Sequence, residues 1–263
     1  RNVMTSTQTK LSIDGLTKRY GDLEALSSVS LDIDRGEFVS IVGPSGCGKT
    51  TFLRIVGGLE HMTSGAARLD GKPISGPGLD RGFVFQQDSL LPWRTIESNI
   101  AIGLEINGRM GSQEDGHMEK LLRLVGLSGF GGYYPRQLSG GMRQRANLAR
   151  ALAIDPELLL MDEPFSALDA QTREIMQTEL LRIWQIGMKT VLFVTHQIDE
   201  AVYLSDRVVV FARRPGRINE IIDIDLPRPR PLEIKRTQAF TRLVDHIWKL
   251  IESDVRESVL GEQ

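Results

Sequence analysis

The chain has 263 residues, of which 41% are hydrophobic, and its formal net charge is −2 at pH 7. A chain of this length can bury a sizeable core, and its nearly balanced charge argues against nucleic acid as a main partner. The single cysteine, Cys47, excludes an internal disulfide and fits a reducing compartment. No apolar run approaches the roughly 18–20 residues that span a bilayer, so a role at a membrane would require another chain.

The first expected elements are short strands with alternating polarity. Residues 11–20 (LSIDGLTKRY) and 29–34 (VSLDID) alternate in this way, and Asp70–Gly71 is a hairpin turn signal. These patterns predict an antiparallel β subdomain near the start of the chain.

Three later segments are continuously apolar, which is typical of parallel strands covered on both faces. They are FVSIV (38–42), LLLM (158–161) and TVLFV (190–194). Helical patterns follow or separate them around residues 49–59, 140–154, 168–186 and 197–204. The fold class predicted from these patterns is α/β, with a mainly parallel sheet and right-handed crossovers.

The organisation predicted for the chain is one domain over residues 10–215 followed by a C-terminal extension over 216–263. Residues 88–155 look helical and are interpreted as an inserted α-helical subdomain. Residues 226–233 (LPRPRPLE) are interpreted as an extended linker with solvated arginines. A final amphipathic helix is expected around residues 240–251, packed on its own domain rather than serving regulation.

Each of the three apolar strands is followed by polar residues. GPSGCGKT (43–50) follows the first strand, Asp162–Glu163 the second and Thr195–His196 the third. Ligands of open parallel sheets bind beyond the carboxyl ends of the strands, so we expect these groups to serve one site.

Residues 43–50 match the phosphate-loop pattern G-x-x-x-x-G-K-[ST] between a strand and a helix. Glycines let successive N–H groups point inward, and the helix N-terminus adds a positive dipole end. Lys49 would reach the β- and γ-phosphates, Thr50 would bind Mg²⁺ and Thr51 could reach the α-phosphate. The alternative to phosphate binding is that residues 43–50 form only a tight turn between the strand and the helix. The predicted nucleotide contacts of the loop are Gly43, Pro44, Ser45, Gly46, Cys47, Gly48, Lys49, Thr50 and Thr51. The same helix N-terminus is expected to favour the Cys47 thiolate.

The acidic pair Asp162–Glu163 is predicted to bind the metal and to take part in catalysis. Neighbouring residues of an extended chain point to opposite sides, so Asp162 can hold Mg²⁺ while Glu163 faces the attacking water. The alternative is that both acids cap the next helix. Pro164 disfavours it, because proline should hold Glu163 in an extended conformation. His196 is predicted to contact the γ-phosphate, although a lone histidine is more often an ordinary surface or core residue.

The segment LSGGM (138–142), together with the phosphate loop and LLLMDEP (158–164), resembles the nucleotide-binding subunit of an ATP-binding cassette (ABC) transporter. The resemblance covers nearly all of residues 10–215 and implies a P-loop NTPase core that hydrolyses ATP. It implies that Gln86, with Gln87 as the competing choice, binds the metal, takes part in the reaction and links the ATP site to the helical subdomain. It also places Tyr20 under the adenine ring, where stacking suits an apolar face.

The resemblance further implies a head-to-tail dimer. Ser139, Gly140 and Gly141 should form a helix N-terminus with free N–H groups, and the anion they meet would be the γ-phosphate bound by a second ATPase subunit, expected to be identical. The alternative to this phosphate contact is that these residues form only a glycine-rich helix cap. Asp169, at the end of Ser166–Asp169, lies in the segment that resembles the dimer-contact loop. Met142 departs from the usual glutamine, which puts one contact across the dimer in doubt.

Softer features point to a subfamily. MDEPFSALD (161–169) resembles bacterial importers, and LLPWRT (90–95) and the tail LPRPRP (226–231), followed by an amphipathic helix, resemble their nitrate/sulfonate/taurine branch. This implies integral membrane permease subunits, an indirect extracytoplasmic solute-binding protein and a peripheral position at the cytoplasmic face of the membrane. Trp93 would lie near the groove for a permease helix or anchor its own loop. A soluble ABC ATPase with a mechanical or regulatory role is the alternative function. The presence of one cassette and the short spacing from Gln86 to Leu138 oppose it.

Overall fold

The computed structural model describes residues 8–87, 89–108, 116–213 and 215–260. The chain forms two compact units, each with its own internal contacts. One comprises Arg1–Gly78 with Lys189–Gln263, and the other comprises Leu79–Met188. Each unit contains parallel strands whose carboxyl ends carry residues singled out in the sequence.

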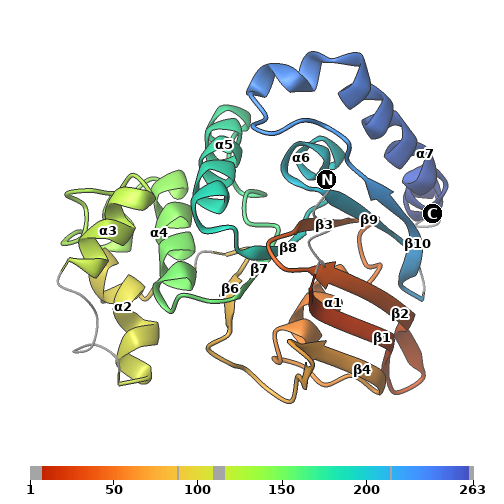
Figure 1. The fold of residues 1–263 in the computed structure, drawn as a ribbon, viewed down its shortest axis with the longest axis horizontal. Coiled ribbons are helices and arrows are strands. Elements are labelled where there is room, and N and C mark those ends of the chain that lie inside the picture. Colours follow the sequence, from red (N-terminus) through yellow and green to blue (C-terminus); the bar gives the residue numbers. More distant parts are fainter. Residues whose placement is uncertain (1–7, 88, 109–115, 214, 261–263) are drawn as a thin grey trace, which may run out of the picture. The chain divides into compact units, whose positions relative to one another are not determined.

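The antiparallel sheet of the first unit has the strand order β2-β1-β4-β5, and Figure 1 labels the first three of these strands. Its strands are β1 (Thr9–Tyr20), β2 (Leu23–Asp34), β4 (Ser64–Leu69) and β5 (Lys72–Pro73). The turn between β4 and β5 is Asp70–Gly71, and both residues have positive φ, 48° and 74°. Two successive left-handed residues are what a tight hairpin requires. The predicted antiparallel patch and its turn are therefore confirmed.

The second sheet of this unit places β10 (Arg217–Asp223), β9 (Arg207–Ala212), β3 (Phe38–Val42) and β8 (Thr190–Val194) next to one another in that order. β3 runs parallel to both β9 and β8, while β10 is antiparallel to β9. All residues of β3 and β8 are buried, as expected for strands covered on both faces. Among the helices of the unit are α1 (Lys49–Val56), α6 (Ile198–Leu204) and α7 (Gln238–Leu260). The predicted parallel strands are confirmed.

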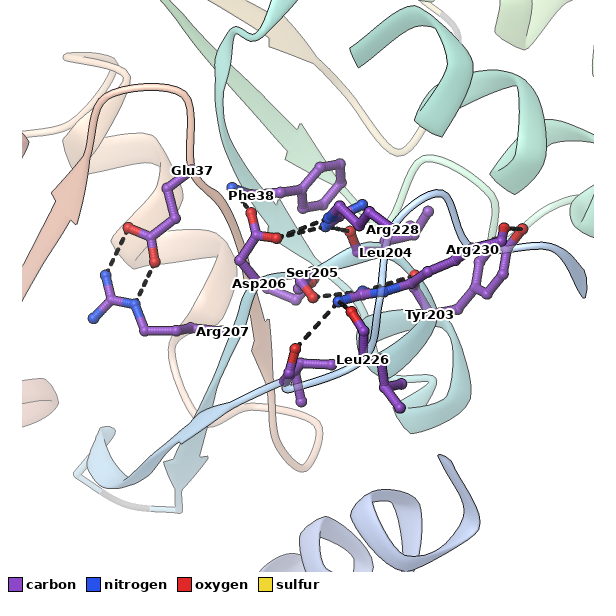
Figure 2. Close-up of polar contacts among 12 residues, drawn as sticks. Glu37, Phe38, Tyr203, Leu204, Ser205, Asp206, Arg207, Leu226, Arg228 and Arg230 are labelled. Atoms are coloured by element: carbon purple, nitrogen blue, oxygen red, sulfur yellow. Dashed lines mark hydrogen bonds and ion pairs between the residues drawn. The ribbon is translucent and has the colours of Figure 1, made fainter. Parts of the chain in front are cut away.

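The proline-rich segment is held against α6 rather than standing free. Arg230 is only 5% exposed. Its guanidinium donates hydrogen bonds to the carbonyl groups of Val202, Tyr203 and Ser205, and to those of Ile224 and Leu226 (Figure 2). The last carbonyls of a helix lack intrahelical partners, and a cation placed there satisfies them.

Arg228 makes a second attachment beside Arg230. It forms an ion pair with Asp206 and donates to the carbonyl of Leu204 at 2.7 Å. Asp206 in turn accepts a hydrogen bond from the N–H of Phe38, the first residue of β3 (Figure 2). The expectation of solvated linker arginines was wrong, because carbonyls at the end of α6, distant in the sequence, accept hydrogen bonds from both side chains.

Helix α7 covers part of the same unit. It packs against α6 and β9, and the 3₁₀ turn η2 (Leu232–Arg236) precedes it. Phe240, Ile247 and Ile251 are buried, whereas Trp248 is 45% exposed. The predicted packing of this helix on its own domain is confirmed.

The second unit combines two parallel strands with helices (Figure 1). The strands β6 (Arg81–Val84) and β7 (Leu158–Asp162) pair so that Val84 lies opposite Met161. The helices are α2 (Ile96–Ile106), α3 (His117–Leu124), α4 (Gly140–Ala153) and α5 (Ala170–Gly187), with the 3₁₀ turn η1 (Pro135–Gln137) before α4. α4 packs against α2, α3, α5 and β6. Within the described ranges of the whole chain, no helix combines the length and apolarity needed to cross a membrane.

Candidate active site

The phosphate loop connects β3 to α1, and close contacts require two of its glycines, Gly43 and Gly48. A Cβ atom on Gly43 would lie 2.6 Å from the carbonyl oxygen of Phe211. Gly48 is the N-cap of α1, has φ 91°, and would place a Cβ 2.6 Å from a methyl carbon of Leu26. Because Gly48 has no side chain to cap the helix, the N–H groups of the first turn face a potential ligand.

Lys49 lies inside this loop. Its side chain is buried, with the residue 6% exposed. Nζ donates to the carbonyls of Gly43 at 2.7 Å and Pro44 at 3.0 Å. The loop is therefore curled around an ammonium group, so an anion in the loop would meet a positive charge as well as backbone N–H groups.

The pKa of Cys47 differs from the expectation based on the position of this residue beside a helix N-terminus. The thiol is fully buried and lies 3.7 Å from Lys49 Nζ. Burial raises the pKa of Cys47 and outweighs the opposing effect of the Lys49 charge. The predicted preference for the thiolate was wrong, because desolvation disfavours the charged form more than the nearby cation favours it.

Tyr20 ends β1 beside the helix of the phosphate loop. It is 46% exposed, and its hydroxyl forms hydrogen bonds with the side chains of Glu60 and Thr51. Thr51 belongs to α1, so this contact brings the aromatic ring close to the loop. Partial burial, followed by the bond with Glu60, raises the pKa of Tyr20. Lys18 Nζ lies 4.7 Å from the ring centroid.

His196 leaves the sheet at the same edge as the phosphate loop. β8 is parallel to β3 with Val194 opposite Ile41, and the Thr195 N–H donates to the Ile41 carbonyl at 3.1 Å. His196 itself is exposed. The Thr195 hydroxyl donates a hydrogen bond to the buried carboxylate of Glu200, an interaction that no motif in the sequence predicts. The sequence signal for it is weak, since Glu200 is one of two acids in the first turn of the following helix.

Gln86 and Glu163 meet in the second unit. Gln86 follows β6 and Glu163 follows β7, whose last residue is Asp162, so both leave the same edge of a parallel pair. Gln86 Nε2 lies 3.4 Å from Glu163 Oε2, which favours Gln86 over its neighbour Gln87. Asp162 is 7% exposed.

The backbone at Glu163 differs from the expectation. Its φ is +43°, in the left-handed region. The extended conformation predicted from Pro164 was therefore wrong, because the turn that follows β7 overrides the local preference of a residue before proline.

Two helix starts in the second unit carry the remaining predicted residues. Ser139 caps α4, accepting from the N–H of Met142 at 3.3 Å, and Gly140 and Gly141 begin that helix. Asp169 caps α5, accepting from the N–H of Thr172 at 3.0 Å and from its hydroxyl at 2.6 Å. The bonds from Thr172 lower the pKa of Asp169. Both sites therefore use a side-chain oxygen to satisfy a helix N-terminus.

Two arginines of α4 donate hydrogen bonds to carbonyl groups of nearby loops. Arg143 donates to the carbonyl of Leu138 at 2.8 Å, and Arg145 donates to those of Val125 and Gly126. Arg143 therefore holds the residue before the N-cap of α4, and Arg145 holds the turn that follows α3.

Comparison with known proteins identifies the family. The family model described as ABC transporter matches residues 26–166. An uncharacterized ABC transporter ATP-binding protein of Methanocaldococcus jannaschii is 56% identical over 225 residues, covering 84% of each chain. This chain belongs to the ABC transporter family.

Other relatives of this ABC protein have more specific names. A nitrate import ATP-binding protein of Synechocystis sp. is 44% identical over 239 residues, covering 89% of this chain and 90% of the relative. A taurine import ATP-binding protein of Rhizobium johnstonii is 45% identical over 241 residues, covering 89% and 92%. The chain is thus an ATP-binding subunit similar to those of importers.

A solved structure supports the fold and the enzymatic class of this ABC protein. It is a dimeric ATP-binding cassette in a post-hydrolysis state, bound to ADP and Pi. The TM-score is 0.71 at 33% identity, covering 82% of this chain and all of the other. The ABC protein is therefore an ATPase with the P-loop NTPase fold, as predicted.

Proposed function

We propose that this ABC ATPase energises a bacterial importer for a small oxyanion or sulfonate, such as nitrate, taurine or an alkanesulfonate. The observation that carries the proposal is that relatives named for nitrate and taurine import each cover 89% of this chain at 44% and 45% identity. Permease subunits and an extracytoplasmic solute-binding protein would determine which molecule is carried, since the ATPase need not touch it.

In this proposal the first unit binds the nucleotide. Lys49 contacts the β- and γ-phosphates, Thr51 the α-phosphate, and Tyr20 stacks on adenine. The buried ammonium of Lys49 and the ring of Tyr20 beside Thr51 support these roles. His196 contacts the γ-phosphate, in keeping with its position at the strand edge shared with the loop.

The metal in this proposal is Mg²⁺ carried by the nucleotide. Mg²⁺ is usually bound through one or two carboxylates together with substrate phosphates, rather than in an all-protein cage. Asp162, Thr50 and Gln86 supply a carboxylate, a hydroxyl and an amide oxygen, so the residues fit the ion. When bound, Mg²⁺ would neutralise charge on the phosphates. Glu163 orients the attacking water, and its contact with Gln86 supports a common role.

A second copy of the chain completes the proposed site. Ser139, Gly140 and Gly141 at the start of α4 would face the γ-phosphate bound by the other subunit, with Asp169 in the contact loop. Two observations support this arrangement. Both segments are capped helix starts, and a solved relative is dimeric. Phosphate binding at such termini needs only free N–H groups and the helix dipole.

The permease contact proposed here lies at the start of α2. Trp93 is 71% exposed and Tyr133 is 43% exposed. The carbonyl of Tyr133 accepts from the N–H of Ile96, the first residue of α2, and Trp93 lies just before that helix. Exposed aromatic side chains are favoured at protein interfaces. A contact there would hold the subunit at the cytoplasmic face of the membrane.

Extraction of membranes with a mild detergent tests the importer assignment. The tagged chain should co-purify with its permease, and Trp93→Ala should weaken this association while leaving basal ATPase activity intact. Ile186→Ala is a matched control, because Ile186 is 67% exposed on α5. Recovery of the active ATPase without any membrane protein would favour the soluble alternative. In proteoliposomes, a solute-binding protein loaded with nitrate or with taurine should be added in turn. ATP hydrolysis should rise only with the molecule that the importer carries.

Glu163→Gln tests the catalytic assignment. The variant should bind ATP but lose about 100-fold or more in kcat, the range typical of a general base. It should also accumulate as a dimer with ATP, measured by light scattering. Hydrolysis at the parent rate would show that another residue serves as the base.

A further inference from the structure

The backbone of Glu163 is strained. Its φ of +43° is in the left-handed region, which non-glycine residues rarely adopt. Such a conformation costs about 1–3 kcal/mol and persists only where the surrounding structure enforces it. Pro164 adds to this strain, because a residue before proline favours an extended conformation. The surrounding structure must therefore hold Glu163 in place.

Ser166 supplies a contact that helps to hold Glu163. Its hydroxyl donates to the carbonyl of Glu163 at 3.0 Å, and its backbone N–H donates to the same carbonyl at 3.2 Å. The hydroxyl also accepts from Gln86 Nε2 at 3.4 Å, and the same amide reaches the Glu163 carboxylate. Ser166 thus contacts both the backbone of Glu163 and the side chain that lies against its carboxylate.

The rest of the loop is held independently of this hydroxyl. Arg173 donates to the carbonyl of Phe165 at 3.3 Å and to that of Leu168 at 2.7 Å. The N–H of Leu168 also donates to the carbonyl of Phe165 at 3.1 Å. Removing the Ser166 hydroxyl should therefore disturb Glu163 while leaving the following residues in place.

We propose that Ser166 is a positioning residue for ATP hydrolysis, whose hydroxyl holds the left-handed backbone of Glu163 and so directs its carboxylate. Ser166 acts through Glu163 rather than on the reacting atoms. The inference rests on the proposed role of Glu163 as the group that orients water. Without the hydroxyl, the Ser166 N–H still donates to the Glu163 carbonyl, but this single bond holds the backbone less firmly against the conformation that Pro164 favours. A displacement of about 1 Å at a catalytic group can cost about 100-fold in rate.

Steady-state kinetics of the full chain test the proposal. Ser166→Ala should lower kcat about tenfold or more, with the KM for ATP and the Kd for nucleotide unchanged. Ser166→Thr keeps the hydroxyl and should recover most of the rate. Thr178→Ala is the matched control, since the Thr178 hydroxyl donates to the Glu174 carbonyl at 3.0 Å within α5. Parent-like kcat in Ser166→Ala, or an equal fall in Thr178→Ala, would overturn the proposal.

A double-mutant cycle separates this role from a role at the dimer contact. In the Glu163→Gln background, Ser166→Ala should leave both the residual rate and the ATP-dependent dimer unchanged, because its effect passes through the glutamate. A further loss of either would mean that Ser166 acts elsewhere. If Glu163→Gln is inactive and Ser166→Ala is fully active, only the inference about Ser166 fails. If Glu163→Gln hydrolyses ATP normally, the assignment of the base itself fails.

Discussion

Arg230 donates a hydrogen bond from Nη1 to the carbonyl of Ser205 at 2.7 Å, joining the proline-rich segment to the end of α6 (Figure 2). Burial, and to a lesser degree the charge of Arg228, lowers the pKa of Arg230 to about 10, so the side chain remains charged at neutral pH. A buried charge is costly unless it is hydrogen-bonded, and here backbone carbonyls provide that compensation.

Arg230→Met should therefore lower the free energy of unfolding by about 3 kcal/mol, because buried carbonyls lose a charged donor. The measurement is urea denaturation of the purified chain. Arg236→Met is the control, since Arg236 is exposed at the end of η2 and its loss should change stability by less than about 0.5 kcal/mol. Equal stability of the two variants would contradict a stabilising role for Arg230.

Cys47 should react slowly with iodoacetamide at pH 7. The thiolate is the reactive form, and burial raises the pKa of this thiol, so little thiolate forms at neutral pH. The rate should rise as the pH increases beyond the usual pKa of 9.0. Mg-ATP should slow the reaction further, since the thiol lies in the phosphate loop.

The reference for this experiment is the same chain unfolded in urea, where Cys47 should react several-fold faster at pH 7. Mass spectrometry of the labelled peptide measures both rates. Labelling at the unfolded rate, or labelling unaffected by nucleotide, would contradict the buried position of the thiol.

Lys49→Ala should raise the Kd for ATP by about 100-fold, because hydrogen bonds between charged groups contribute about 1.5–3 kcal/mol each. Calorimetric titration with Mg-ATP gives the affinity directly. Lys72→Ala removes an exposed lysine on β5 and should bind normally. Near-parent affinity in the Lys49 variant would count against the phosphate-loop assignment.

Tyr20 offers a test of adenine stacking with two related variants. Tyr20→Ala should weaken ATP binding about tenfold, since base–aromatic stacking contributes about 1–3 kcal/mol. Tyr20→Phe keeps the ring and loses only the hydroxyl that bonds to Glu60, so its affinity should stay near that of the parent. If both variants bind ATP equally well, the ring does not support adenine.

Several parts of the fold and site could be predicted because their causes are local. Continuous apolar runs predicted β3 and β8, since a strand buried on both faces needs apolar residues throughout. The Asp70–Gly71 turn was predictable because few residues adopt two successive left-handed conformations. Strand β10 was not predicted, because its pairing with β9 depends on the fold rather than on a strong local pattern.

By itself, the sequence determined the strand-to-helix phosphate loop, the position of Lys49 within it and the acids that follow β7, because these features need only neighbouring residues at fixed spacing. The tertiary structure decided the rest. It buried Arg230 against carbonyls at the end of α6, raised the pKa of Cys47 by desolvation, and held Glu163 at positive φ against the preference of Pro164. These outcomes depend on burial and hydrogen bonds that form only when the chain has folded.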